Sequence, residues 1–274
     1  ADVLAVARIL AGTATDADYK QIGATDGDAD AIRYGYFRLG TNLFISNSEF
    51  FGLGFRGENG RPFGGCFDFD AYTVTINLVR TSHEDNEFAF DNSIHIADYG
   101  FFAYAYGDGT NPCLIRNAKM QGFIGINTMD LTTDPGHTDH VNVGGLAGTL
   151  GKNVVLDGIE SSVSVGAQVR YAELYLGGIF GLCSSSAEAW CDVRYDGSFN
   201  DVSGVTHGDN VSVVAGTYAG VIQNASVDGI TIDAEKSMVL ANSLGDVSGS
   251  AIAGGFVGII ELGATTTHNL SAAR

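Results

Sequence analysis

The chain has 274 residues and a formal net charge of −18, from 32 acidic and 14 basic side chains. This charge argues against nucleic acid and against an anionic membrane as partner, because phosphate binding depends on clustered Lys and Arg. Glycine is abundant, with 38 residues, whereas there are only three prolines and 45% of the residues are hydrophobic. That composition favours a folded chain, and no apolar run approaches the ~20 residues that a membrane-spanning helix needs.

The first dozen residues carry the clearest helical pattern in the chain. We expect a short helix over Asp2–Leu10, inside an N-terminal entry cap of residues 1–45. The sequence starts at Ala1 without Met, a basic region or a tag, as a chain does after a signal peptide has been removed. We therefore expect an extracellular or cell-surface protein.

Three carboxylates alternate around Gly27 in this entry segment. Asp26, Asp28 and Asp30 have the spacing of a calcium-binding loop, but the bidentate Glu that completes such a loop is missing. We keep them as candidate calcium ligands, with a charged turn as the alternative. No other cofactor is expected.

Four cysteines occur without any Cys-x-x-Cys spacing, which argues against a structural zinc site. In an oxidising compartment we expect Cys183 to pair with Cys191 across a small loop, and Cys66 to pair with Cys113. Four buried thiols are the alternative.

Asp68 and Asp70 are two residues apart, so they share one face of a strand. Solenoid polysaccharide lyases and hydrolases use clustered carboxylates on an exposed sheet face. In a chain with this excess of acid, however, such pairs are more often solvated surface. No Gly-x-Ser-x-Gly elbow, P-loop or dinucleotide fingerprint is present, so we expect the protein not to be an enzyme.

Aromatic residues alternate in Phe102-Ala103-Tyr104-Ala105-Tyr106, which predicts three rings on one face of a strand. We expect this row to be a ladder in the core, and the alternative is an exposed row that stacks on sugar rings or on a partner subunit.

A possible metal site follows in the segment that contains His137, Asp139 and His140. Two histidines three residues apart need at least one further ligand to hold zinc or nickel, so we expect a solvated loop.

A glycine-marked block recurs four times in the second half of the chain: Val143–Gly148, Leu176–Gly181, Ala215–Gly220 and Ala253–Gly258. The first glycines of the blocks are Gly144, Gly177, Gly216 and Gly254, roughly 33 to 39 residues apart. A second glycine follows in three of them, Gly145, Gly178 and Gly255, whereas Thr217 takes its place in the third block.

Short runs rich in Val and Ile, with period-two alternation, separate the blocks and predict strands. A unit of this size cannot bury its own apolar face, but stacked units can. We therefore expect an all-β fold, a parallel, right-handed β-solenoid (β-helix) over residues 46–274. The glycines are expected to supply positive φ at a corner and to let one coil approach the next. A propeller is the alternative, but repeated Trp-Asp pairs are missing and Trp190 is the only Trp.

The blocks Gly144-Gly145-Leu146-Ala147-Gly148, Gly177-Gly178-Ile179-Phe180-Gly181 and Gly254-Gly255-Phe256-Val257-Gly258 resemble the repeats of the GLUG-motif family of bacterial surface proteins. That family's pattern is a double glycine, two small or apolar residues and a third glycine. The resemblance covers residues 143 to 260, and it implies an adhesin-like β-solenoid.

Two functions remain as expectations. The ends of a solenoid present unpaired strand edges that can template another chain, so we expect a structural surface protein whose copies self-assemble into a filament, sheath or surface layer. The alternative, implied by the resemblance alone, is an adhesin module that binds host or biofilm glycans. Neither nucleic acid nor membrane insertion is expected.

Overall fold

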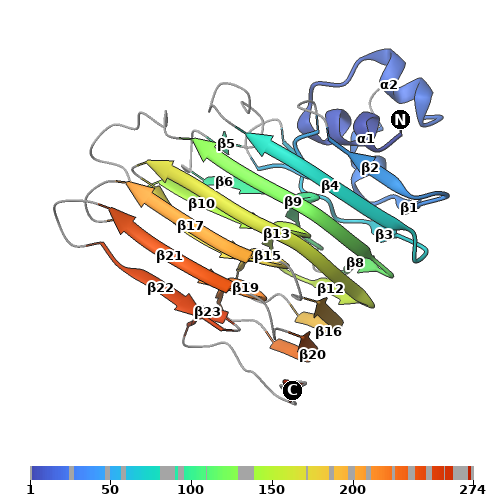
Figure 1. Cartoon of the computed structure of the whole chain (residues 1–274). Coiled ribbons are helices and arrows are strands. Elements are labelled where there is room, and N and C mark those ends of the chain that lie inside the picture. Colours follow the sequence, from blue (N-terminus) through green and yellow to red (C-terminus); the bar gives the residue numbers. More distant parts are fainter. Residues whose placement is uncertain are drawn as a thin grey trace.

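The computed structural model describes residues 2–24, 28–46, 50–56, 60–80, 90–91, 96–108, 110–128, 139–170, 172–184, 188–196, 201–207, 211–223, 226–233, 238–244, 249–255, 257–261 and 271–272. Over these residues the chain forms short helices at its N-terminal end, followed by a stack of β-strands that fills the rest of the molecule (Figure 1).

The strands belong to four sheets that run along the stack. Sheet A contains β1 (Tyr36–Arg38), β3 (Cys66–Asp68), β8 (Cys113–Arg116) and β12 (Val154–Asp157). Sheet B contains β2 (Leu43–Ile45), β4 (Thr73–Arg80), β9 (Lys119–Thr128), β13 (Ile159–Arg170), β16 (Glu188–Asp196), β17 (Asp201–His207), β20 (Ser226–Asp233), β21 (Met238–Leu244) and β24 (Ser271–Ala272). Sheet C contains β7 (Phe102–Ala105), β11 (Ala147–Leu150), β15 (Phe180–Cys183), β19 (Ala219–Ile222) and β23 (Val257–Ile260). Sheet D contains β5 (Phe90–Asp91), β6 (Ile96–Tyr99), β10 (Asp139–Gly144), β14 (Ala172–Gly177), β18 (Val213–Gly216) and β22 (Ala251–Gly254).

Successive coils visit sheets D, C and B in the same order, and β12 is the last described strand of sheet A. The strands β10, β11, β12 and β13 lie in sheets D, C, A and B, and β14 then returns to sheet D beside β10. All described strand pairings are parallel except that of β5 with β6. This repetition in register confirms the predicted parallel β-solenoid, while its right hand stays a prediction.

The strand β13 shows why the sequence folds in this way. Alternate residues from Ile159 to Val169 are buried, and the residues between them are partly exposed. The strand pairs with β9 residue for residue, from Glu160 opposite Lys119 onward, so its buried side chains stack on those of the preceding coil. The core therefore comes from stacking, because one coil alone encloses too little apolar surface.

The glycine blocks form the turn from sheet D to sheet C. Their first glycines end four neighbouring strands and stand opposite one another in register: Gly144, Gly177, Gly216 and Gly254. Two residues later, a fully buried side chain follows in each of the first three blocks: Leu146, Ile179 and Tyr218. The recurrence seen in the sequence is thus one turn repeated coil after coil.

Close packing explains the first glycines. A Cβ atom on Gly144 would lie 2.7 Å from the carbonyl oxygen of Ile179, and one on Gly177 would lie 2.7 Å from that of Tyr218. The expected close approach of neighbouring coils is therefore confirmed. The expected positive φ is wrong for both glycines, because the chain makes this turn in ordinary backbone conformations.

The second glycines differ from block to block. A Cβ on Gly145 would meet the carbonyl oxygen of Gly178 in the next coil. At Gly255 no further described coil follows, and an added Cβ would meet nothing within 4 Å. Thr217 occupies this place in the third block and is buried, so one coil accommodates a side chain there.

Helices cover the N-terminal end of the solenoid, beside β1 and β2 (Figure 1). The helix α1 (Asp2–Ala11) confirms the expected helix, and two helices follow that were not expected, α2 (Asp16–Gln21) and α3 (Ala29–Arg33). Side chains of α1 join the main core, and β1 and β2 already lie within the segment expected to be a cap. No described helix is long and apolar enough to cross a membrane.

Candidate functional site

The outward side of sheet B is the largest array of side chains that the described strands place on one face. Figure 1 shows β4, β9, β13, β17 and β21 side by side. The outer face of sheet B is defined here by the following described residues: Phe44, Thr73, Thr75, Asn77, Val79, Lys119, Gln121, Phe123, Gly125, Asn127, Glu160, Ser162, Ser164, Gly166, Gln168, Arg170, Ser203, Val205, His207, Leu240, Asn242 and Leu244.

Parallel register aligns these residues in rows across the strands. One row contains Thr75, Gln121 and Ser162. A longer row runs across five strands through Val79, Gly125, Gly166, Ser203 and Leu240. Each row therefore crosses the boundary between coils, and no single coil contains the site.

Among the side chains that the structure describes, few carboxylates lie on this face. Among its described residues Glu160 is the one acidic side chain, and it stands in register with Lys119 at one end of the strands. Arg170 and His207 stand in register at the other end. The described side chains in the rows between these ends carry no charge, which is unusual for a chain with a net charge of −18.

Exposed apolar side chains also gather here. The described residues include eight large hydrophobic side chains that are exposed, and five of them lie on the outer face of sheet B. Their exposed fractions are 64% for Phe44, 58% for Val79, 50% for Leu240, 45% for Leu244 and 41% for Phe123. Single exposed apolar residues need no explanation, but a group on one face indicates an interaction surface.

The ring of Phe123 lies along the sheet. A Cβ atom on Gly125 would be 2.7 Å from Cζ of this ring, and one on Gly166 would be 3.6 Å from its Cε2. The two glycines are opposite each other on β9 and β13. Because neither glycine has a side chain, one face of the Phe123 ring packs on the two glycines and the other face is exposed to solvent.

Polar groups on the same face are held by cross-strand hydrogen bonds. The Gln121 amide nitrogen donates to Oγ1 of Thr75 over 2.9 Å. Gln168 Nε2 lies 3.0 Å from Nε2 of His207. These bonds order hydroxyl and amide groups on a surface that also carries flat apolar groups, a combination suited to an uncharged polymer with many hydroxyl groups.

Asp68 and Asp70, the candidate carboxylate pair, lie in and just after β3 of sheet A, away from this face. Asp68 is buried and accepts hydrogen bonds from Nε of Arg116 at 3.0 Å and Nδ2 of Asn117 at 2.9 Å. Asp70 binds Arg38 at 2.7 Å. Burial alone would raise the pKa of Asp68, but the Asn117, Asp70 N–H and Arg116 bonds outweigh it and hold the pKa below its usual value. Both carboxylates are therefore occupied by structural partners.

The candidate metal ligands lie at two places in the chain. Asp26 is outside the described residues, Asp28 is the N-cap residue of α3, and Asp30 is 3.2 Å from Nε of Arg61. His137 is also outside the described residues, while Nδ1 of His140 is 3.3 Å from Oε2 of Glu173. No group of three metal-ligating side chains occurs within the described part of the chain.

Cysteine pairing differs from the expectation. Cys66, Cys113 and Cys183 are free thiols, and the side chain of Cys191 lies outside the described residues. Register explains why Cys66 and Cys113 do not pair. Cys66 stands opposite Leu114, on the partly exposed side of sheet A, whereas Cys113 is one residue away on the buried side. The predicted Cys66–Cys113 bridge is therefore wrong in this structure, and Cys183, expected to pair with Cys191, is likewise unpaired.

The predicted aromatic row also differs. Phe102 is in the core, but Tyr104 and Tyr106 are half-buried. The strand breaks its period of two, because Phe102 and Ala105 both face the core and stand opposite Ala147 and Leu150. Tyr104 instead packs under Arg56, whose guanidinium carbon is 4.0 Å from the ring centre.

Comparisons with known proteins found no matching family model, no matching curated protein and no matching solved structure. The resemblance to GLUG-motif repeats thus rests on the glycine blocks of the sequence alone.

Proposed function

We propose that this protein is an extracellular binding module of the adhesin type, which holds neutral glycans against the outer face of sheet B. The observation that carries the proposal is the pair of exposed Phe side chains in rows whose described polar side chains are uncharged, on one face of an otherwise acidic protein. The location outside the cell is part of the proposal.

Each part of the face has a role in this function. The open side of the Phe123 ring stacks on the apolar side of a sugar ring, and the neighbouring amide and hydroxyl groups bond to sugar hydroxyls. Phe44 lies two strands away, beside Thr75, and offers a second stacking position. Acidic glycans would be repelled by the net charge, so neutral chains are favoured.

Glycan arrays followed by calorimetry test the proposal. Replacing Phe123 by Ala is expected to weaken binding to a neutral glycan by about 2- to 10-fold per stacked ring. The matched control is Tyr34→Ala, because Tyr34 is 40% exposed but lies outside sheet B. Binding should also change little with salt, since no ion pair is involved. The proposal fails if no neutral glycan binds, or if the two variants weaken binding equally.

Self-association is the second candidate, supported by the last described coil. Ala251, Ala253 and Ile260 occupy core-facing positions in register with buried residues of the preceding coil, yet all three are exposed. The helical cap covers the opposite end, so contact through this end alone would give pairs of molecules. Sedimentation velocity over a range of concentrations tests it: a dimer that Ile260→Asp dissociates supports the candidate, and a monomer throughout contradicts it.

A further inference from the structure

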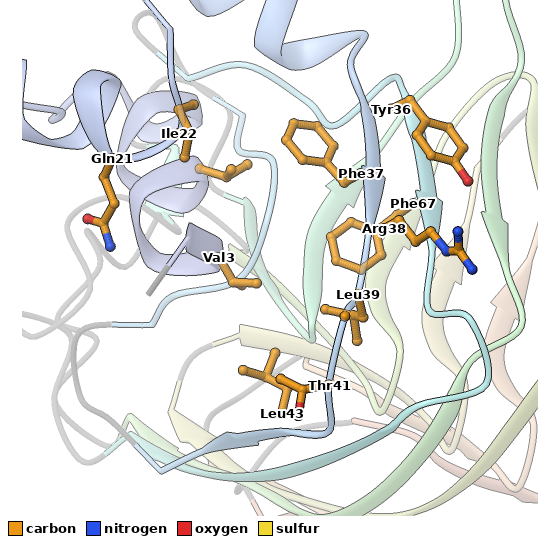
Figure 2. Close-up of a pocket in the computed structure, with 12 residues that line it drawn as sticks. Val3, Gln21, Ile22, Tyr36, Phe37, Arg38, Leu39, Thr41, Leu43 and Phe67 are labelled. Carbon is orange, nitrogen blue, oxygen red and sulfur yellow. The ribbon is translucent and has the colours of Figure 1, made fainter.

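A pocket of about 470 Å³ lies between the helical cap and the first coil (Figure 2). Its walls are mostly apolar and come from α1, from the end of α2 and from the segment that contains β1 and β2: Val3, Val6, Ile22, Phe37, Leu39 and Leu43. The one cationic side chain in its lining, Arg38, is already bound to Asp70 at 2.7 Å. The pocket therefore suits an apolar group and not an anion.

One edge of β1 adjoins this pocket. In the described part of the chain β1 pairs with β3 alone. The Leu39 N–H donates to the Asp68 carbonyl, and the Gly35 carbonyl accepts from the Cys66 N–H. Alternate residues of a parallel strand bond to opposite neighbours, so Tyr36 and Arg38 direct their backbone N–H and C=O groups to the other edge.

Tyr36 and Arg38 both line the pocket. Among the described residues, neither makes a backbone hydrogen bond on that edge. Unpaired backbone groups of this kind are a template for one more strand. The pocket and the edge together form a site that has both a backbone and a side-chain component.

We propose that an extended segment of a partner protein pairs with β1 and inserts an apolar side chain into this pocket. The added strand would continue an interface that the structure already contains, because β3, β8 and β12 follow β1 in the same parallel ladder. Backbone pairing provides affinity for any extended peptide, and the pocket selects the side chain. This site is independent of the outer face of sheet B.

The probe is a fluorescein-labelled peptide of sequence Thr-Val-Thr-Leu-Thr-Val-Thr, with binding to the full chain measured by fluorescence anisotropy. Replacing its central Leu by Ala is expected to weaken binding at least about 10-fold, because several buried carbon atoms are lost. A peptide N-methylated at alternate amides is expected not to bind, since it cannot form the ladder.

Gly40→Trp is the matching change in the protein. Gly40 lines the pocket, its φ is not left-handed, and an added Cβ meets nothing within 4 Å, so the indole is free to fill the pocket. Gly255→Trp is the control, because Gly255 is equally open and lies in the last coil. Circular dichroism and thermal melting verify that both variants fold.

Binding that N-methylation and Gly40→Trp abolish, and that Gly255→Trp preserves, supports the proposal. Equal binding of the N-methylated peptide would assign the pocket to small apolar ligands and overturn it. Failure of the probe to bind would also overturn the proposal. If the chain self-associates and Gly40→Trp abolishes this self-association, the occupant of the site is a second copy, and the proposal is overturned as well.

Discussion

Replacing Gly177 by Ala tests whether close backbone contact locks the coils together. The added Cβ would overlap the carbonyl oxygen of Phe180 and would lie 2.7 Å from both Cα of Ala219 and the carbonyl oxygen of Tyr218. All three are backbone atoms, in the same coil and in the next. None can turn aside in the way that the end of a flexible side chain can.

The size of the effect follows from these contacts. Overpacking a well-packed site costs about 1 to 3 kcal/mol, and we expect about 3 kcal/mol here because two coils must separate to admit the methyl group. Gly255→Ala is the control within the same motif. The added Cβ at Gly255 meets nothing within 4 Å, so the free energy of unfolding of this variant should stay within about 0.5 kcal/mol of the parent's. It should rise slightly if the loss of conformational entropy in the unfolded chain dominates.

Urea unfolding followed by circular dichroism measures both variants. Hydrogen exchange read by mass spectrometry adds the location, because coils of a solenoid couple mainly to their neighbours. Protection should fall first in β14 and β15 and in the adjoining β18 and β19. If the free energy of unfolding of Gly177→Ala is within about 0.5 kcal/mol of that of the parent, the steric explanation of the glycine blocks is refuted.

Two further predictions concern titration and reactivity. Hydrogen bonds from Arg8 and from Thr15 lower the pKa of Asp18 from 3.8 to about 2, so the Arg8–Asp18 link should stabilise the cap above pH 4 and be lost as the pH falls toward 2. Acid titration followed by circular dichroism should show that Asp18→Asn loses this dependence, and an unchanged profile would contradict the assignment. Burial raises the pKa of Cys183 to about 12 and raises that of Cys113, whereas Cys66 is less buried. In a Cys191→Ser background iodoacetamide should therefore label Cys66 first, as mass spectrometry would reveal, and earlier labelling of Cys113 or Cys183 would disprove it.

The repeated turn was predictable because its requirement is local. Each coil needs a residue without a side chain where the next coil passes, and Gly144, Gly177 and Gly254 mark that place in the sequence. Strands between the blocks were predictable for the same reason, since a strand with one buried face shows alternating apolar and polar residues in the local sequence.

The corresponding turn of the preceding coil was not identified from the sequence, because it is one residue shorter. Tyr99 stands opposite Val143 and Phe102 opposite Ala147, so Gly100 and Phe101 replace a three-residue turn. A search for double glycines cannot detect this variant. The buried contact between Gly100 and the next coil shows that the same steric rule applies there.

The outer face of sheet B could not be predicted, because it depends on register between coils. Phe123 and Gly166 are far apart in the sequence, and only the pairing of β9 with β13 brings the ring over the glycine. The lack of charge at the alternate positions from Ser162 to Gln168 is visible in the sequence, but it does not reveal which strands continue the pattern. The disulfide prediction failed for a related reason, since spacing along the chain does not tell which side of a sheet each thiol faces.

Differences in coil length are concentrated at the passage from sheet B to sheet D. One residue separates the end of β13 at Arg170 from the start of β14 at Ala172, whereas ten separate the end of β9 at Thr128 from the start of β10 at Asp139. Both passages lead into strands that keep their register with their neighbours. Foreign epitopes or enzymes grafted at this corner would therefore be carried at the spacing of the coils along the stack of parallel strands, which makes the fold a scaffold for display.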